Sequence, residues 1–257
     1  MKRNKRKSRK KRGGRVFSFF LVLVMIGVIV ASVTMFFQTN NIEVTGTSRY
    51  TPEEIIAASG LMVGDNLFAV NKFEVERRIK EQYPYVASVE IRRRLPDTFL
   101  FTVTERTPVA YLDVGEQRWI LDKDAYLLEP LSISETVPYL QVVSASEAVD
   151  PHSGKRLTLP EEGAVNALEA VMDGLSDLNI IAEVGQIDVS KLYRLTFLYQ
   201  NRLQVQLGNA EKMEKKLRLF ATILAELDAT DRGVLNVSEP PEGRFQPDSS
   251  VGIGGEE

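Results

Sequence analysis

His152 is the only histidine of this 257-residue chain and the first side chain to consider for catalysis. It lies in the segment Asp150-Pro151-His152-Ser153-Gly154, so a hydroxyl nucleophile and a base are neighbours in the sequence. Adjacent side chains do not face each other, and the chain has no Gly-x-Ser-x-Gly turn that would expose a nucleophile. Without cysteine, it also lacks a thiol nucleophile and a zinc site of the usual nitrogen and sulfur type. We therefore expect an exposed loop histidine, no metal and no cofactor.

Paired carboxylates could serve as a general acid and a general base, and three pairs stand out. Each pair also suits a purely structural role, because Glu53-Glu54 and Glu161-Glu162 fit the first turn of a helix, and Asp122 with Asp124 fits a turn. Glycoside cleavage needs a sugar cleft, usually lined by aromatic side chains, and the chain has one Trp. No glycine-rich phosphate loop precedes a Lys-Ser/Thr pair. The favoured class is therefore a non-enzymatic protein without a small-molecule substrate.

Three consecutive arginines, Arg92-Arg93-Arg94, form a sharper cluster of charge. On a strand, Arg92 and Arg94 share one face and Arg93 takes the other. Two interpretations stay open: a solvated strand edge that discourages pairing, or a docking surface for an acidic partner. Arg92 and Arg94 are candidate partner-binding residues on the second interpretation.

A long uncharged run follows a strongly basic start. Ten of the first fifteen residues are Lys or Arg, and the next 22 residues, 16–37, carry no charge. A helix of that length extends ~33 Å, enough for the ~30 Å hydrocarbon core of a bilayer. Flanking positive charge stays on the cytoplasmic side, which places later residues outside. The sequence thus predicts a basic cytoplasmic tail over residues 1–15 and a single transmembrane helix over residues 16–37 in the cell membrane.

A cleaved secretory signal and a nucleic-acid-binding tail both fit this region less well than a membrane anchor. A cleaved signal has a shorter apolar core and a small-x-small site, and no Ala-x-Ala precedes Gln38. A basic run can bind nucleic acid, but topology and anionic lipid account for it without further assumptions, so no nucleic acid is expected. The net charge of -3 becomes -13 without the tail, because 22 basic residues then face 35 acidic ones. We expect an acidic ectodomain that is stable without disulfides, since the chain has no cysteine.

Residues 41–105 predict the order strand, helix, helix, strand, strand. Thr51-Pro52-Glu53-Glu54 is a helix start and Gly60 a helix end. A second helix begins at Asn71, with Phe73, Val75 and Ile79 expected to face inward, and Leu67 and Phe68 are expected in the core. Residues 86–93 and 98–105 alternate as strands do. Two helices on one face of a small sheet would bury both apolar sets.

This order, and the residues that carry it, resemble the POTRA domain of the FtsQ/DivIB family of bacterial cell-division proteins. The matching segments are Val44-Thr45-Gly46, Gly64-Asp65-Asn66-Leu67-Phe68, Pro84-Tyr85-Val86, Arg92-Arg93-Arg94-Leu95-Pro96 and Glu105-Arg106-Thr107-Pro108-Val109-Ala110. The resemblance implies an α+β fold: the transmembrane helix, a small POTRA domain (β-α-α-β-β) over residues 40–108, and a larger mixed α+β domain with an extended sheet over residues 109–238. The family usually has Gly where Ala125 stands, so a positive φ there would strain this residue.

The C-terminal part holds the most regular helix pattern. Over residues 210–227 apolar side chains recur at steps of four and three, at Met213, Leu217, Phe220, Leu224 and Leu227. Residues 234–237 then predict a final strand. From Glu239 on, Pro, Gly, Ser and Glu dominate, which predicts a disordered tail over residues 239–257.

The resemblance implies a divisome scaffold at the septum that helps to assemble septal cell-wall synthesis complexes. Expected partners are FtsL-like and DivIC/FtsB-like single-span proteins and, through them, the septal peptidoglycan synthase. Binding would occur by strand addition to the open edge of the last strand, with Val234, Leu235, Asn236, Val237 and Phe245 as candidate residues. Charge or proline substitutions at Leu235 or Val237 should then weaken partner binding while the protein stays folded and inserted in the membrane. The alternatives are a membrane-anchored cell-wall enzyme and an extracytoplasmic adaptor outside division.

Overall fold

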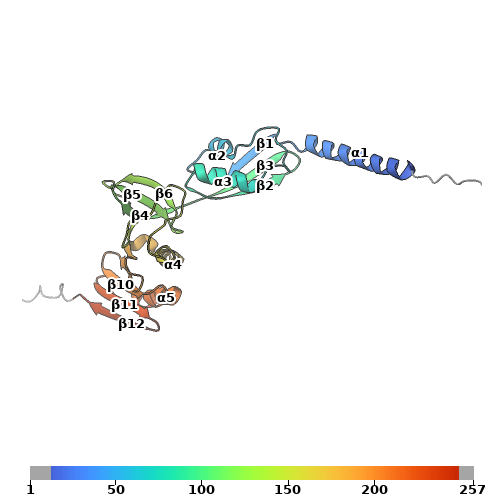
Figure 1. The fold of residues 1–257 in the computed structure, drawn as a ribbon. Helices are drawn as coiled ribbons and strands as arrows, with labels where there is room; N and C mark the ends of the chain where they lie inside the picture. Colours follow the sequence, from blue (N-terminus) through green and yellow to red (C-terminus); the bar gives the residue numbers. More distant parts are fainter. Residues whose placement is uncertain (1–12, 249–257) are drawn as a thin grey trace, which may run out of the picture. The chain divides into compact units, whose positions relative to one another are not determined.

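The chain, seen in a computed structural model that describes residues 13–248, divides into two compact units (Figure 1). The first unit holds the residues up to Ile79 together with Ser88–Thr104. The second holds Lys80–Ala87 together with the residues from Glu105 onward. Each unit has its own sheet, of three and nine strands respectively, so the fold is mixed α+β.

All of the uncharged run except Phe37 lies in helix α1, Gly13–Phe36. Among residues 13–248, no helix combines the length and the apolar character that crossing a membrane demands. The transmembrane helix expected over residues 16–37 is thus not borne out by the structure and stays a prediction from the sequence. The basic tail expected over residues 1–15 lies almost entirely outside the described residues.

The first unit packs two helices with a three-stranded sheet, in the predicted chain order. Its strands have the order β1-β3-β2, with β1 parallel to β3. Gly46, directly after β1, has a φ of +84°, and a Cβ there would lie 2.2 Å from the carbonyl oxygen of Val103, so only glycine fits. The elements are β1 (Asn41–Thr45), α2 (Pro52–Ser59), α3 (Lys72–Gln82), β2 (Val86–Arg94) and β3 (Thr98–Glu105).

The start and end of α2 follow the predicted capping chemistry. The Thr51 side chain accepts a hydrogen bond from the backbone N–H of Glu54, and the Glu54 carboxylate accepts one from the N–H of Thr51. Gly60 ends the helix in the left-handed conformation, at φ 68°. Local sequence therefore determines both ends of this helix.

Two aromatic residues of this unit differ from expectation. Phe73 was expected to face inward but is 83% exposed. It precedes the buried Val75 by two positions, which is ~200° around a helix, so both residues cannot face the sheet. Phe68 was expected in the core and is half exposed, whereas its neighbour Leu67 is fully buried.

The second unit is organised around one nine-stranded sheet of order β12-β11-β10-β9-β8-β7-β4-β5-β6. Most neighbours are antiparallel, but the pairs β4–β7, β7–β8 and β10–β11 are parallel. The strands are β4 (Pro108–Val114), β5 (Gln117–Asp122), β6 (Leu127–Ser132), β7 (Leu140–Val143), β8 (Val184–Asp188), β9 (Leu195–Tyr199), β10 (Leu203–Gly208), β11 (Gly233–Glu239) and β12 (Glu242–Pro247). A short 3₁₀ helix, Ile181–Glu183, precedes β8.

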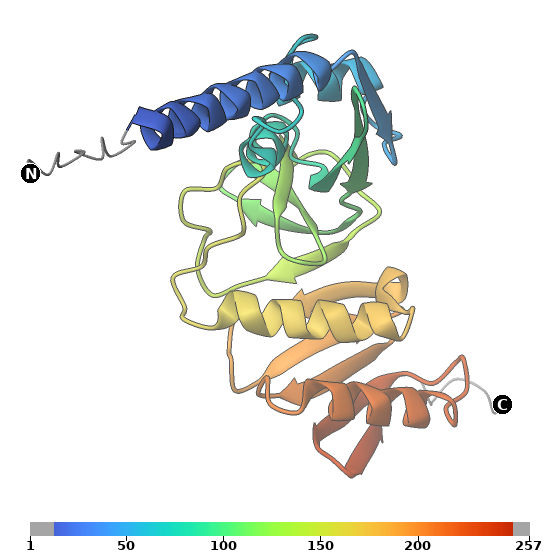
Figure 2. The same ribbon diagram turned by 90° about the vertical axis from the view of Figure 1, so that its right-hand side faces the viewer.

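Helices α4 (Ala164–Asp177) and α5 (Met213–Leu224) cover the same face of the β8–β12 part of this sheet (Figure 2). Leu168 and Leu175 of α4 join Leu217 and Phe220 of α5 in one continuous core with the inward side chains of the strands. In β10, buried Leu203, Val205 and Leu207 alternate with Gln204 and Gln206. The opposite face of this part of the sheet is therefore polar and open.

The predicted tail needs correction at its start. Glu242–Pro247 form strand β12, which pairs antiparallel with β11 in the register Leu235↔Phe245. Residues 249–257 of the predicted tail lie outside the described residues. The ladder with β11 and the half-buried Phe245 side chain stabilise a segment whose composition is otherwise typical of a linker.

An ion pair is buried in the second unit where the chain leaves β3. The Arg106 guanidinium donates to the Asp122 carboxylate at 2.5 Å, and both side chains are almost fully buried. Arg106 also lies 3.6 Å from the centre of the Tyr126 ring, and Asp122 accepts the backbone N–H of Tyr126. The turn that follows places Ala125 at φ 55°, in the left-handed region that the family's glycine would tolerate without strain.

We expect Arg106→Met to destabilise the second unit by about 3–5 kcal/mol, because the Asp122 carboxylate would remain buried without its counter-ion. Urea unfolding followed by the fluorescence of Trp119, a side chain of the same core, measures this. The double variant Arg106→Met/Asp122→Asn should recover part of the loss. A single-variant loss below about 1 kcal/mol would contradict a structural role for the pair.

The pKa of Glu74 in α3 is lowered from 4.5 to about 2, first by the hydrogen bond from Arg77 and then by that from Arg78. A depressed pKa contributes stability above pH 4.5 that is lost as the pH falls toward 2. Carboxyl NMR titration of the full chain should give this low value. It should return toward 4.5 in Arg77→Gln/Arg78→Gln, and an unchanged pKa in that variant would refute the cause.

Candidate partner-binding edge

The predicted strand residues lie inside the sheet and not at its edge. β11 is hydrogen-bonded to β10 on one side and to β12 on the other. Leu235 and Val237 are fully buried in the core, while Val234 and Asn236 lie on the opposite face. The open edge expected at residues 234–237 is therefore corrected to β12, and Leu235 and Val237 are core residues whose truncation would destabilise the unit.

β12 is the last strand of the sheet and is paired on one side only within residues 13–248. The backbone N–H of Asp248 donates to the carbonyl of Arg232 at 2.9 Å. Because inward and outward groups alternate along an antiparallel strand, this bond and the register place the backbone groups of Gly243 and Phe245 outward. Pro247 is outward as well and offers only its carbonyl. The edge therefore offers two donors and three acceptors to another strand.

The two faces of β12 differ in chemistry. Phe245 is half buried and packs on the core side, whereas Arg244 and Gln246 are exposed on the polar side. A groove of about 850 Å³ on that polar side reaches the edge strand. Its lining residues are Leu198, Arg202, Gln204, Gly233, Val234, Gln246, Pro247 and Asp248. A strand added to β12 would thus place alternate side chains beside this groove, whose lining mixes polar and apolar residues, and beside the apolar core.

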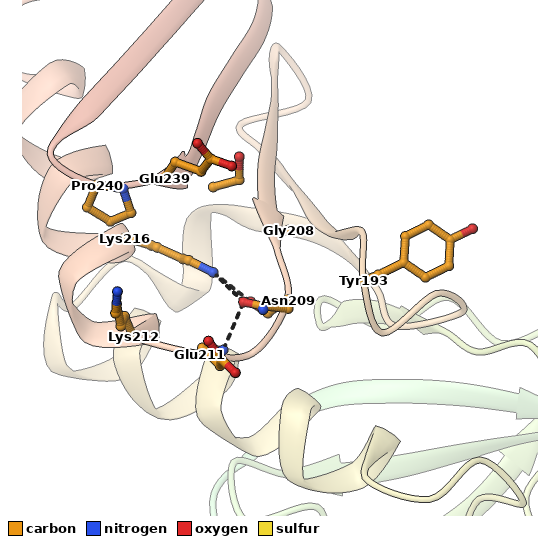
Figure 3. Close-up of a pocket in the computed structure, with 9 residues that line it drawn as sticks. Tyr193, Gly208, Asn209, Glu211, Lys212, Lys216, Glu239 and Pro240 are labelled. Atoms are coloured by element: carbon orange, nitrogen blue, oxygen red, sulfur yellow. Dashed lines mark hydrogen bonds between the residues drawn. The ribbon is translucent and has the colours of Figure 1, made fainter.

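A second cavity, of about 470 Å³, lies at the turn that joins β11 to β12, beside the start of α5 (Figure 3). Lys216 is buried there, and its Nζ donates to the backbone oxygen of Asn209 at 2.8 Å and to the Oδ1 of Asn209 at 3.0 Å. Burial lowers the pKa of Lys216. The helical spacing of residues 210–227 did not reveal this lysine, because charge normally marks a solvated position. Its partners are amide groups, so it braces the loop before α5.

The arginine candidates belong to the first unit. β2 is one edge of the three-stranded sheet, and Arg92 and Arg94 share a face, as predicted. Arg92 pairs with Glu90, and Arg94 reaches Glu43 on β1. Arg93 points the other way and donates to the backbone oxygen of Leu67 at 2.5 Å. The structure therefore pairs both candidates with surface carboxylates, and the docking role stays a prediction.

The residues considered for catalysis do not come together in a catalytic arrangement among residues 13–248. His152 is exposed, and its Nδ1 lies 2.8 Å from the backbone oxygen of Asp150. Within residues 13–248, no group of histidine and carboxylate side chains is arranged to hold a metal ion. Asp122 and Glu54, from two of the carboxylate pairs, are engaged in the ion pair and the helix cap described above.

Comparison with known proteins identifies the family. Residues 37–106 match the family description "POTRA domain, FtsQ-type", and residues 110–238, about half of the chain, match "Cell division protein FtsQ/DivIB, C-terminal". The chain belongs to the FtsQ/DivIB family. The resemblance drawn from the residues is thereby confirmed.

Relatives of this FtsQ/DivIB chain match most of its length. It is 26% identical over 234 residues to the cell division protein DivIB of Clostridium botulinum (strain Hall), covering 90% of both chains. It is 30% identical over 203 residues to the cell division protein FtsQ of Geotalea daltonii, covering 76% of this chain and 69% of that one. The solved major extracytoplasmic domain of DivIB from Geobacillus stearothermophilus, in its trans isomer, matches with a TM-score of 0.32 and 14% identity, over 49% of this chain and 98% of that chain.

The family match and the candidate edge meet at the end of β11. The match to the C-terminal FtsQ/DivIB family ends at Ser238, and β12 begins at Glu242. The edge strand of this FtsQ/DivIB chain therefore lies just beyond the matched residues.

We expect Leu235→Ala to lower the free energy of unfolding by about 2–5 kcal/mol, because it leaves a cavity in a fully buried site. The matched control is Gln204→Ala, an exposed side chain of β10 on the opposite face, with an effect within about 0.5 kcal/mol. Urea unfolding monitored by Trp119 compares the two. Equal stabilities would contradict the placement of β11 within the core.

Proposed function

We propose that this chain is a non-enzymatic scaffold of the division machinery that captures an extended segment of a partner protein on the free edge of β12. The observation that carries the proposal is the one-sided pairing of β12 at the end of the sheet, in a chain of the FtsQ/DivIB family. The partners proposed are FtsL-like and DivIC/FtsB-like single-span proteins and, through them, the septal peptidoglycan synthase.

The chemistry of the edge supports strand addition. Main-chain hydrogen bonds to Gly243 and Phe245 would supply affinity without regard to the partner's side chains. Specificity would come from Phe245 on one face and from Arg244 and Gln246 on the other. Of the residues expected to bind, Phe245 lies on this edge, and Val234 and Asn236 lie one strand behind it on the polar face.

We further propose that the chain acts at the cell membrane, with its N-terminus cytoplasmic and both units outside. The proposal rests on the uncharged run of residues 16–37 behind ten basic residues and on the family. Apolar side chains along α1, among them Phe17, Leu21, Val24 and Val28, are exposed and would need an apolar environment. The domain limits proposed are residues 40–108 and 109–238, with β12 added to the second.

The decisive comparison is Phe245→Pro against Phe245→Ala. Both lose the aromatic ring, but only proline removes the outward N–H, at a position where it leaves the ladder with β11 intact. We expect the proline variant to bind its DivIC/FtsB-like partner at least about fivefold more weakly than the alanine variant, because it leaves a backbone carbonyl of the partner unpaired, which costs about 1–3 kcal/mol. Binding of the full chain in detergent, with circular dichroism as a folding check, measures this.

Equal binding by the two folded variants would reject backbone pairing at Phe245. A fluorescent fusion of the unmodified chain tests the wider proposal. Enrichment at the septum supports it, and an even distribution around the membrane favours an adaptor outside division.

A further inference from the structure

The loop between α2 and α3 exposes large apolar side chains, which is unusual for a surface loop of a soluble unit. Met62 is 72% exposed, Val63 is 77% exposed and Phe68 is 50% exposed. No charged residue other than Asp65 lies between Leu61 and Asn71, and Asp65 turns its carboxylate onto the backbone N–H of Met62. We call Met62, Val63 and Phe68 the apolar loop patch.

This loop is held against the segment that directly follows α1. The N–H of Leu67 donates to the carbonyl of Phe37 at 3.0 Å, and the N–H of Thr39 donates to the carbonyl of Asp65 at 2.7 Å. Gly64 returns a bond to the carbonyl of Thr39 at 2.8 Å. These bonds fix the loop beside residues 37–39, whatever direction α1 takes.

Aromatic contacts extend the patch toward α1. The ring of Phe68 packs edge-on against the ring of Phe37, with 5.3 Å between the ring centres. Phe37 packs in the same way against Phe36, which is itself 68% exposed. Phe68 therefore links the apolar loop patch, through Phe37, to the exposed apolar side chains of α1. The Arg93 guanidinium lies 5.3 Å from the centre of the Phe68 ring and adds a cation at the margin of the patch.

We propose that the apolar loop patch inserts into the interfacial region of the extracytoplasmic leaflet, so that the first unit is seated on the lipid surface. Protein surfaces that combine apolar side chains with a neighbouring cation bind to the boundary between lipid headgroups and acyl chains. The inference rests on the proposed anchoring by residues 16–37. It adds a second membrane contact, which restrains the first unit close to the bilayer.

The absence of cysteine allows one spin label per chain at a chosen site. The test uses the full chain in phosphatidylethanolamine and phosphatidylglycerol vesicles, labelled at Val63→Cys, Val24→Cys or Thr104→Cys. Thr104 is exposed near the end of β3, which runs parallel to β1 and so away from α1. Thr98 pairs with Asn41 at the start of β1, and Thr104 lies ~20 Å further along β3. Thr104 is therefore a control site at the end of the strand that is distant from α1. Collisions with oxygen, which enriches in lipid, are compared with collisions with a water-soluble nickel chelate.

We expect labels at residues 24 and 63 to collide more with oxygen and the label at residue 104 to collide more with nickel. A water-exposed label at residue 63, with a lipid-exposed label at residue 24, overturns the inference and leaves the anchoring intact. A water-exposed label at residue 24 overturns the anchoring itself. A fourth outcome is that the label at residue 63 loses access to nickel only when partner chains are present in the vesicles. That result overturns lipid insertion and indicates a contact with the partner protein instead.

Discussion

A nine-stranded open sheet must end twice, and each end presents backbone groups that need partners. At β6 part of this need is met within the chain, because Leu127 at its start donates its N–H to the carbonyl of Lys155 and accepts a bond from the N–H of Gly154. At β12 the described residues supply no further strand. The unsatisfied edge of β12 is the constraint on which the proposed function depends, since it leaves one strand position for another protein to fill.

An edge strand resembles a loop in its sequence. Natural edges are short and carry charge, glycine or proline, which discourages uncontrolled pairing. Glu242, Gly243, Arg244 and Pro247 meet that description, and Phe245 is the one large apolar residue of β12. Composition therefore predicted a disordered tail here, and the preceding strand was mistaken for the edge because its alternating Leu235 and Val237 gave a clear strand pattern. The apolar pattern that reveals a strand also indicates that the strand is buried.

Features that depend on residues close together in the sequence were predicted correctly, whereas burial and contacts between distant residues were predicted less well. Thr51, Glu54 and Gly60 determined α2 through bonds within a few residues, so the sequence was sufficient. Phe73 was assigned to the wrong side of its helix and the burial of Lys216 was missed, because residue type was weighed above helical position. The positive φ of Ala125 could be anticipated only through the family's glycine. The Arg106–Asp122 pair joins residues 16 positions apart and became visible only in three dimensions.

Strand addition by itself would give modest affinity. Five outward backbone groups contribute about 2.5–7.5 kcal/mol at about 0.5–1.5 kcal/mol per hydrogen bond. Association costs about 4–15 kcal/mol in lost translational and rotational freedom, so the edge alone would barely hold a free peptide. Confinement of both proteins to one membrane lowers that cost, because binding then resembles an intramolecular step at a raised effective concentration. A unit seated on the lipid by its apolar loop patch would lower the cost further. Weak pairing on β12 combined with a membrane tether would allow a complex that assembles at the septum and also releases its partners.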